Sequence, residues 1–289
     1  MPELPEVETI RRELEGLIIG KTFARPQLHI PTTIAFPEPG SFSAKLEGRS
    51  VSALERRGKY LLIRLDRLIL VVHLRMTGNL VYSTEQKPAE ARFLRVSLPF
   101  TDRTALFYSD MRRFGRLWLV HNEVELKEQV LKKVGPDIYN DLDAKAFAAL
   151  LKSKGNRRLK ALLLDQEFAA GMGNIYTDEC LYRCCFHPLR RVDSLSEEEK
   201  KQLFQAIRDV LDEGIKYGGT SFRDYRNAAG ALGQFQQKLN VYNRQGEYCS
   251  RCGAEIEKTV VAGRGTYFCP GCQAAEEAET VQERKPGKS

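Results

Sequence analysis

The chain has 289 residues, 42% of them hydrophobic, with a formal net charge of +7 and a sequence pI of about 9.0. This length allows about two domains with real cores, and the basic excess favours a polyanionic partner such as nucleic acid. No apolar run approaches the roughly 18 residues of a membrane span, and no signal pattern begins the chain. Seven cysteines, four of them at metal spacing, argue against a secreted disulfide framework. We therefore expect a soluble, cytoplasmic protein.

The first residues combine a helix start with a reactive group. Removal of Met1 would leave Pro2 with a free secondary amine. An α-amino group titrates near about pH 8, so a useful fraction is neutral at pH 7 and can attack an aldehyde or a sugar C1′. Glu3 lies beside it as a candidate acid or base. Read alone, the stretch also fits a plain lead into a helix, whose first turn suits Pro5.

A helix and then a strand-rich region follow. Apolar residues recur at helical spacing as far as Leu17, and Gly20 stops the run. We expect this helix to present Pro2 and Glu3 outward. The expected strands are 60–65, 68–74, 79–82, 93–98, 105–108 and 117–120. Short strands without helices between them predict a β-sandwich or flattened barrel, with a loop at 87–91.

Helical patterns predominate after the strands. The expected helices are 123–134, 144–152, 159–167, 174–184 and 197–216, with a linker near 135–141. Gly173 and Asn174 form a tight turn before one helix, and such an N-terminus is a natural seat for phosphate. An ordinary helical hairpin fits the same pattern equally well. Residues 218–233 predict a mobile loop, and 273–289 a disordered tail.

Four cysteines form the strongest motif. Two Cys-x-x-Cys knuckles, sixteen residues apart, contain Cys249, Cys252, Cys269 and Cys272. Four thiolates suit a tetrahedral Zn²⁺ whose positions are all filled by protein, which makes the metal structural. The spacer predicts a β-hairpin whose Gly-Arg-Gly tip projects Arg264. That cation is well placed for a phosphate, although a solvated arginine fits as well. We interpret Cys180, Cys184 and Cys185 as packing or surface residues.

A second group of residues lies at strand ends. Lys59 precedes strand 60–65, His73 ends the next strand, and Met76 lies in the following turn. Arg112 and Phe114 lie at another strand end. Large apolar tips beside arginine suit insertion into a base stack. Core packing would also explain Met76 and Phe114.

Six motifs in order make the chain resemble the bacterial formamidopyrimidine-DNA glycosylase family. They are MPELPEVET at 1–9, RGKYL at 57–61, HLRM at 73–76, DMRRFG at 110–115, GNIY at 173–176 and the terminal knuckles. The resemblance covers roughly residues 1–272. It implies an α+β multidomain fold with three parts. These are an N-terminal β-sandwich domain with a leading helix (1–134), a helix–two-turn–helix domain (135–234) and a β-hairpin zinc finger (235–273), followed by a tail (274–289).

The resemblance also implies an activity and roles for residues. The activity is that of a bifunctional DNA glycosylase and abasic-site lyase of base-excision repair, which removes 8-oxoguanine and formamidopyrimidines and ends in β,δ-elimination. By resemblance, Pro2 is the Schiff-base nucleophile and Glu3 the proton donor for sugar opening. Lys59 transfers a proton during β-elimination, and Arg264 grips phosphate for δ-elimination. The implied DNA contacts are His73, Met76, Arg112, Phe114, Lys160 and Asn174, of which Met76, Arg112 and Phe114 fill the gap left by a flipped nucleotide.

The implied partners are few. We expect damaged double-stranded DNA, one structural Zn²⁺ per chain through the four knuckle cysteines, no membrane, and a monomer. A Lys-His-x-His run common in the family reads Arg92-Phe93-Leu94-Arg95 here, so Arg92 or Arg95 would supply the charge. Thr77 and the loop 220–233 bear on lesion preference.

Two alternatives stay open. One is an endonuclease VIII-type glycosylase for oxidised pyrimidines, against which Leu4 and residues 7–9 argue. The other is a non-catalytic, zinc-dependent damaged-DNA-binding protein. The intact set of Pro2, Glu3 and Lys59 argues against that second alternative.

Overall fold

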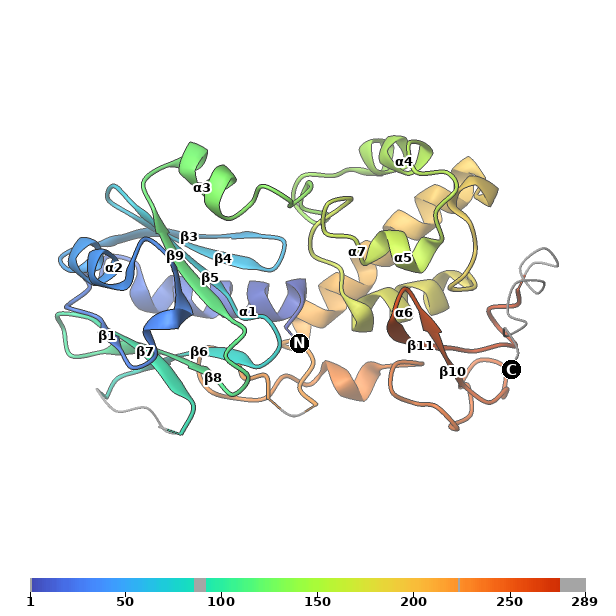
Figure 1. Cartoon of the computed structure of the whole chain (residues 1–289). Helices are drawn as coiled ribbons and strands as arrows, with labels where there is room; N and C mark the ends of the chain where they lie inside the picture. Colours follow the sequence, from blue (N-terminus) through green and yellow to red (C-terminus); the bar gives the residue numbers. More distant parts are fainter. Residues whose placement is uncertain (1, 86–91, 223, 276–289) are drawn as a thin grey trace, which may run out of the picture. The chain divides into compact units, whose positions relative to one another are not determined.

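The computed structural model describes residues 2–85, 92–222 and 224–275, which fall into two compact units (Figure 1). Unit 1 comprises Met1–Val134 and Asp212–Gln237, and unit 2 comprises Gly135–Leu211 and Lys238–Ser289. The three domains predicted from the sequence have other boundaries than these two units, and they stay a prediction. The predicted loop at 87–91 and most of the predicted tail lie outside the described residues.

Unit 1 is built on two sheets. The five-stranded sheet has the order β2 (Ile34–Phe36), β9 (Arg116–Val120), β5 (Ile69–His73), β4 (Tyr60–Leu65) and β3 (Val51–Arg57). The four-stranded sheet has the order β1 (Gln27–Leu28), β7 (Leu94–Pro99), β8 (Ala105–Asp110) and β6 (Gly78–Ser83). All neighbours are antiparallel except β2 and β9. Their inner faces share one apolar core, so the predicted β-sandwich is confirmed.

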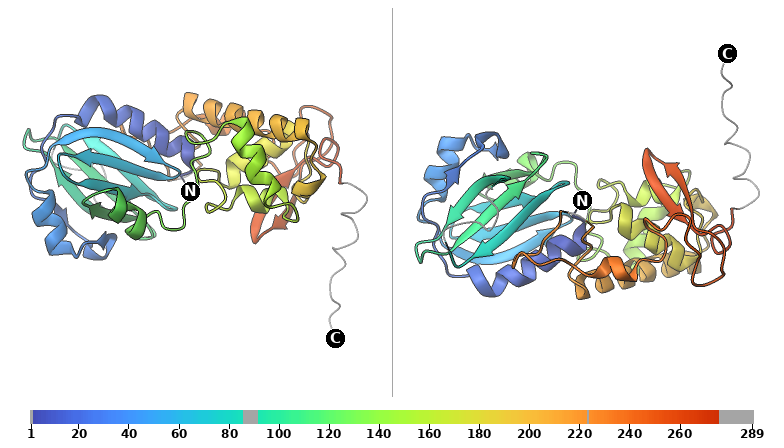
Figure 2. Two further views of the ribbon diagram at one scale, coloured as in Figure 1. Left: turned by 90° about the horizontal axis from the view of Figure 1, so that it is seen from above. Right: turned by 90° about the horizontal axis from the view of Figure 1, so that it is seen from below.

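Helix α1 (Leu4–Ile18) contributes one apolar stripe to that core and packs along β3 and β4 (Figure 2). Its buried side chains include Val7, Ile10 and Leu14, at the predicted helical spacing. Pro2 and Glu3 are also buried, Glu3 with 2% of its surface exposed. The expectation that the helix start presents them outward is therefore wrong.

Several elements of unit 1 differ from the sequence-based expectation. The structure adds β1, β2, β3, the short η1 (Pro31–Thr33) and α2 (Pro39–Leu46). Helix α3 covers Glu123–Gln129 and ends five residues before the predicted 134, where Val130 leaves helical geometry (φ −122°). The remaining six strands lie where their apolar patterns predicted them.

The returning segment of unit 1, residues 212–237, is tied to helix α1. Among the described residues of 218–233 there is no helix or strand, but the backbone N–H of Thr220 donates to Glu6 Oε1 at 2.7 Å. Asn227 Nδ2 donates to Glu13 Oε1 at 2.7 Å. Gly219 has φ +82°, and a Cβ there would lie 2.8 Å from Glu6. The predicted mobile loop is thus hydrogen-bonded to the first helix.

Unit 2 is helical with a terminal hairpin. It contains α4 (Ala144–Lys152), α5 (Leu159–Leu163), α6 (Asn174–Cys184), η2 (Val192–Ser194), most of α7 (Glu197–Lys216), β10 (Glu257–Val261) and β11 (Arg264–Phe268). The short η3 (Phe235–Lys238) lies where the chain passes back from unit 1. Phe147 packs between Phe168 and Phe204, with ring centroids 6.1 and 5.3 Å away. Strand β11 packs on α6 (Figure 1). No helix among the described residues is long and apolar enough to cross a membrane.

Candidate active site and zinc site

The start of α1 is fixed by two glutamates. Glu3 is the N-cap and forms a capping box with Glu6, whose Oε2 accepts the backbone N–H of Glu3 at 2.7 Å. The other oxygen of Glu6 accepts the N–H of Thr220, so this carboxylate holds both the residue after Pro2 and the returning segment. A Glu three residues after a helix N-cap is a recognisable capping signal, so this role of Glu6 could have been found in the sequence.

The turn that carries Lys59 is anchored to the same helix. Gly58 has φ +56°, and its carbonyl accepts Arg56 Nη1 at 3.0 Å. The Nε of Arg56 donates to Glu8 Oε2 of α1 at 3.1 Å, and both side chains are buried. Burial alone would raise the pKa of Glu8, but hydrogen bonds from Arg11 and Arg12 and the charge of Arg56 lower it below its usual value. One ion pair therefore connects the α1 helix with the Lys59 turn.

His73 packs beside Lys59 instead of facing solvent. It pairs with Tyr60 across β4 and β5, and the two rings meet edge to face with centroids 4.4 Å apart. Only 7% of its surface is exposed, and its Nδ1 accepts the N–H of Arg75 at 3.1 Å. Burial, followed by the charges of Arg75 and Lys59, lowers the pKa of His73 to about 3. The predicted DNA contact by His73 stays a prediction, and in the structure the ring is neutral and almost fully covered.

The buried His73 predicts acid sensitivity. The unfolded chain binds a proton at the ordinary pKa of 6.5, whereas the folded protein binds it only near pH 3. The contribution of neutral His73 to the free energy of unfolding is therefore complete above about pH 6.5. It is lost as the pH falls toward 3, and the loss is about 2 kcal/mol at pH 5. Urea unfolding at pH 7 and pH 5, followed by fluorescence of Trp118 in unit 1, measures this loss.

Two variants isolate the His73 effect. His73→Gln removes the buried imidazole and is expected to lose less stability than wild type between pH 7 and pH 5. His121→Gln changes an exposed histidine, with 49% of its side chain accessible, and is expected to follow wild type. Equal losses in wild type and His73→Gln would contradict the assignment.

Three predicted DNA-inserting side chains lie at the surface of unit 1. Met76 and Phe114 are 38% and 48% exposed, so core packing does not explain them. The guanidinium of Arg112 lies 4.9 Å from the ring centroid of Phe114. Met111 in the same turn is 47% exposed. The two turns thus present apolar tips beside a cation, as insertion into a base stack requires.

Residues 92–95 differ from the Lys-His-x-His run of the family, and the structure shows what one of their two arginines contacts. Arg95 is buried, and its Nε donates to the carbonyl of Asp110 at 2.8 Å, so it supports the turn that carries Arg112. The idea that Arg95 supplies charge to DNA is therefore wrong. Arg92 is exposed, with its guanidinium 5.1 Å from the Phe93 ring centroid.

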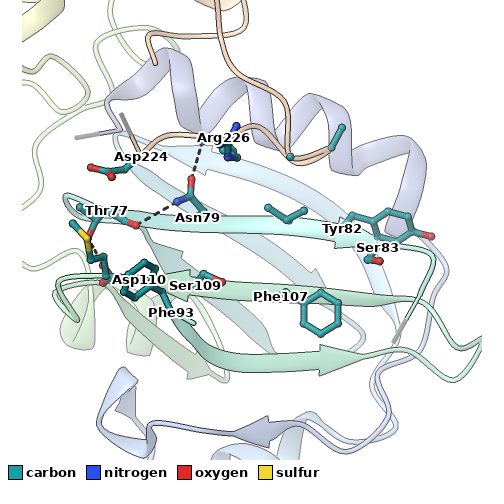
Figure 3. A pocket seen from close by; sticks show the side chains of 14 residues that line it. Thr77, Asn79, Tyr82, Ser83, Phe93, Phe107, Ser109, Asp110, Asp224 and Arg226 are labelled. Atoms are coloured by element: carbon teal, nitrogen blue, oxygen red, sulfur yellow. Dashed lines mark hydrogen bonds between the residues drawn. The ribbon is translucent and has the colours of Figure 1, made fainter. Parts of the chain in front are cut away.

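A pocket of about 790 Å³ lies on the outer face of the four-stranded sheet in unit 1 (Figure 3). Its walls come from β6, β8, the turns beside them, the residue before β7 and the returning segment. The lining residues are Thr77, Asn79, Val81, Tyr82, Ser83, Phe93, Phe107, Ser109, Asp110, Met111, Asp224, Arg226, Ala229 and Gly230. The side chain of Asn79 joins two of these walls, since its Oδ1 accepts the N–H of Arg226 at 2.8 Å. The Thr77 end adjoins the turn that carries Met111.

In unit 2, Asn174 at the start of α6 contacts the hairpin that carries Arg264. Arg264 is exposed and opens β11 after a turn at Ala262 (φ +51°) and Gly263 (φ +71°). The carbonyl of Gly265, the next residue, accepts Asn174 Nδ2 at 2.8 Å. The helix N-terminus and the hairpin cation therefore lie close together within this unit.

Lys160, for which a phosphate contact was predicted, lies inside unit 2. It is fully buried, with Nζ 2.6 Å from Asp178 Oδ1 and 3.2 Å from the carbonyl of Gly265. The second carboxylate oxygen of Asp178 accepts the N–H of Tyr267 at 3.0 Å. The predicted phosphate contact by Lys160 stays a prediction, and in the structure its ammonium is paired inside the protein. The ammonium joins α5, α6 and the hairpin that carries Arg264.

The four knuckle cysteines meet at one point. Their sulfur atoms all lie within 4.8 Å of one another. Cys249 Sγ is 3.8 Å from Cys272 Sγ, and Cys252 Sγ is 3.3 Å from Cys269 Sγ. Tetrahedral Zn²⁺ with Zn–S bonds of about 2.3 Å needs sulfurs about 3.8 Å apart, so the residues fit the metal.

The fold and these sites together define a DNA-repair glycosylase with a zinc-binding hairpin. Three family descriptions match in order: the formamidopyrimidine-DNA glycosylase N-terminal domain (residues 1–117), its H2TH domain (134–226) and a zinc finger found in FPG and IleRS (246–275). The chain belongs to the formamidopyrimidine-DNA glycosylase family. The predicted fold and the single structural Zn²⁺ are thereby confirmed.

Individual relatives agree over nearly the whole chain. The formamidopyrimidine-DNA glycosylase of Heliobacterium modesticaldum is 48% identical over 279 residues, which are 94% of this chain and 100% of that protein. The Geobacillus kaustophilus protein of the same name is 44% identical over 274 residues, 94% of this chain and 100% of its own. The structure of a Lactococcus lactis FPG mutant in complex with DNA containing Fapy-dG superposes with a TM-score of 0.86 at 39% identity. The superposition covers 95% of this chain and 100% of that one.

Proposed function

We propose that this protein removes oxidised purines from double-stranded DNA and then cleaves the strand as an abasic-site lyase. The observation that carries the proposal is the α1 N-terminus. There Glu6 holds the backbone of Glu3, the residue after Pro2, and Glu8 of the same helix is joined through Arg56 to the Lys59 turn. Relatives of similar fold were solved with DNA containing Fapy-dG and carbocyclic 8-oxo-G, at 39% and 38% identity.

The proposed chemistry begins at Pro2. Loss of Met1 gives a secondary amine at the positive end of α1, a position that disfavours its protonated form. Its lone pair attacks C1′, and the glycosidic bond breaks with its electrons going to the departing base, which also takes up the proton that the amine nitrogen loses. The nitrogen lone pair then forms the iminium as the C1′–O bond of the sugar ring breaks, and Glu3 gives a proton to the released ring oxygen. Lys59 takes part in proton transfer during β-elimination, in which the C2′ proton is removed and the C3′–O bond breaks.

DNA binding is proposed to use residues of both units. Met76, Arg112 and Phe114 are exposed and suited to fill the space left by an extruded nucleotide. Arg264 and Asn174 supply phosphate contacts, those of Arg264 also serving δ-elimination. The buried Lys160 and Asp178 position the Arg264 hairpin. Since chromosomal DNA is the substrate and the zinc site needs reduced thiols, we infer that the protein works in the bacterial cytoplasm.

A panel of defined duplexes tests the substrate class. Duplexes with 8-oxoguanine or a ring-opened purine opposite cytosine are expected to be cut at least about tenfold faster than a thymine glycol duplex, which corresponds to about 1.4 kcal/mol. Single-turnover rates measure this, with a preformed abasic duplex as the control for lyase activity. A faster reaction with thymine glycol would favour the endonuclease VIII-type alternative. Binding without cleavage of any duplex would favour the non-catalytic one.

A further inference from the structure

A buried hydrogen-bond network joins the two exposed turns of unit 1. One turn ends at Met76 and Thr77, and the other runs from Asp110 through Arg112 to Phe114. The hydroxyl of Thr77 donates to Asp110 Oδ1 and accepts the backbone N–H of Arg112 at 3.0 Å. The same N–H also reaches Asp110 Oδ1 at 3.1 Å. Thr77 and Asp110 are 7% and 1% exposed, so solvent does not compete for these bonds.

Asp110 holds the second turn from both ends. Its Oδ2 accepts the N–H of Gly115 at 2.8 Å, and its carbonyl accepts the buried Arg95 at 2.8 Å. Gly115 itself has no free space, because a Cβ there would lie 1.6 Å from the hydroxyl of Tyr108. The backbone of this turn is therefore held at several points. The Thr77 hydroxyl adds a side-chain link to the Met76 turn, beyond the pairing of Gly78 with Asp110 at the ends of β6 and β8.

The exposed side chains of the two turns lie beside this buried hydrogen-bond network. Met76 is next to Thr77 in the chain, and Arg112 packs on Phe114 at 4.9 Å. Figure 3 shows Thr77 and Asp110 at the same end of the pocket. Side chains that enter a base stack lose less freedom on binding when their backbone is already fixed.

We propose that the Thr77 hydroxyl and the Asp110 carboxylate couple the two turns into one rigid wedge, and that Thr77 is a positioning residue for extrusion of the damaged nucleotide. This inference rests on the wedge role of Met76, Arg112 and Phe114 proposed above. It predicts that the hydroxyl matters for reactions that begin with a stacked base. It matters little where the base is already absent, because extrusion then costs least.

Thr77→Val and Thr77→Ser test the coupling. Valine keeps the shape and removes the hydroxyl, whereas serine keeps the hydroxyl. Thr77→Val is expected to excise 8-oxoguanine from duplex about 10- to 100-fold more slowly than wild type, as loss of a hydrogen bond to a charged group implies. Cleavage of a preformed abasic duplex is expected to stay within about twofold. Thr77→Ser is expected to restore excision.

A 2-aminopurine beside the lesion reports unstacking directly. Its fluorescence is expected to rise more slowly with Thr77→Val than with wild type or Thr77→Ser. Emission of Trp118 on β9, the single tryptophan, confirms that unit 1 stays folded. Excision by Thr77→Val at the wild-type rate would overturn the coupling. So would equal slowing of both reactions, or failure of Thr77→Ser to restore excision.

Phe114→Ala separates this inference from the proposed function. It is expected to slow excision and spare abasic cleavage. If wild type leaves 8-oxoguanine uncut, or if Phe114→Ala excises normally, the proposed function or its wedge fails, and the coupling is overturned with it. If both behave as expected while Thr77→Val matches wild type, the coupling alone is overturned.

Discussion

Protein that keeps any residue in front of Pro2 is expected to bind damaged DNA and to cleave none of it. An added residue turns the secondary amine into an amide, whose lone pair cannot attack C1′. Excision of 8-oxoguanine and cleavage of an abasic duplex should both fall by at least about 10³-fold, as for removal of other enzyme nucleophiles. The phosphate contacts proposed for Asn174 and Arg264 are unchanged, so DNA affinity should remain. The matched control carries the same extra residues after Ser289.

Borohydride identifies the attacking atom. Reduction of an iminium gives a stable amine, so wild type incubated with an 8-oxoguanine duplex and borohydride is expected to become cross-linked to DNA at Pro2. Pro2→Gly retains a primary amine and should give a weaker adduct with slower excision. An adduct mapped to a lysine, with the Pro2-blocked protein still active, would contradict the mechanism.

Glu3→Gln separates sugar opening from nucleophilic attack. Glutamine retains a side-chain oxygen that can cap α1 and removes the ionisable proton. Base removal is expected to slow by about 10²- to 10⁴-fold, the usual share of a general acid. Cleavage of a preformed abasic site should slow less, since its sugar ring already opens in solution. Equal slowing of both would show that Glu3 only supports the helix.

Apolar periodicity predicted much of the fold, and it failed where charged residues are buried in pairs. Strand β3 was missed because Glu55, Arg56 and Arg57 give it a polar pattern, yet Arg56 is buried against Glu8, 48 residues away. Lys160 received its predicted phosphate contact from the resemblance, and apolar periodicity gave no sign that it is buried against Asp178, one helix further on. Burial of a charge depends on its partner, which local sequence does not specify.

The residues of the candidate site that lie in recognisable motifs could be predicted from the sequence. Pro2, Glu3, Lys59 and the four cysteines follow from residue type, spacing and resemblance. The supports that position them were not predictable in this way. Glu6 holds Thr220 across 214 positions of the chain, and the returning segment therefore belongs with the strands. Such contacts follow from the fold as a whole and have no local pattern.

Loss of zinc is expected to weaken DNA binding while leaving unit 1 folded. The hairpin that presents Arg264 has a small core around Tyr182, Val241 and Ile256, to which two of the zinc cysteines also belong. A module of this size depends on its metal for folding. One further tie to the helices is Gln273, which follows Cys272 directly and whose Nε2 donates to the carbonyl of Phe186 at 2.8 Å.

Cys272→Ser is therefore expected to bind less than one Zn²⁺ per chain and to lose about 10- to 100-fold in DNA affinity, the value of one or two charged contacts. The single tryptophan, Trp118, lies in unit 1, so its fluorescence and urea transition should match wild type. Cys185→Ser changes an exposed cysteine outside the cluster and is the control, with zinc and affinity retained. Full DNA affinity in a zinc-free Cys272→Ser protein, or a loss of the Trp118 transition, would contradict the assignment. The first would mean that Arg264 is not a phosphate contact, and the second that the metal stabilises more than its own hairpin.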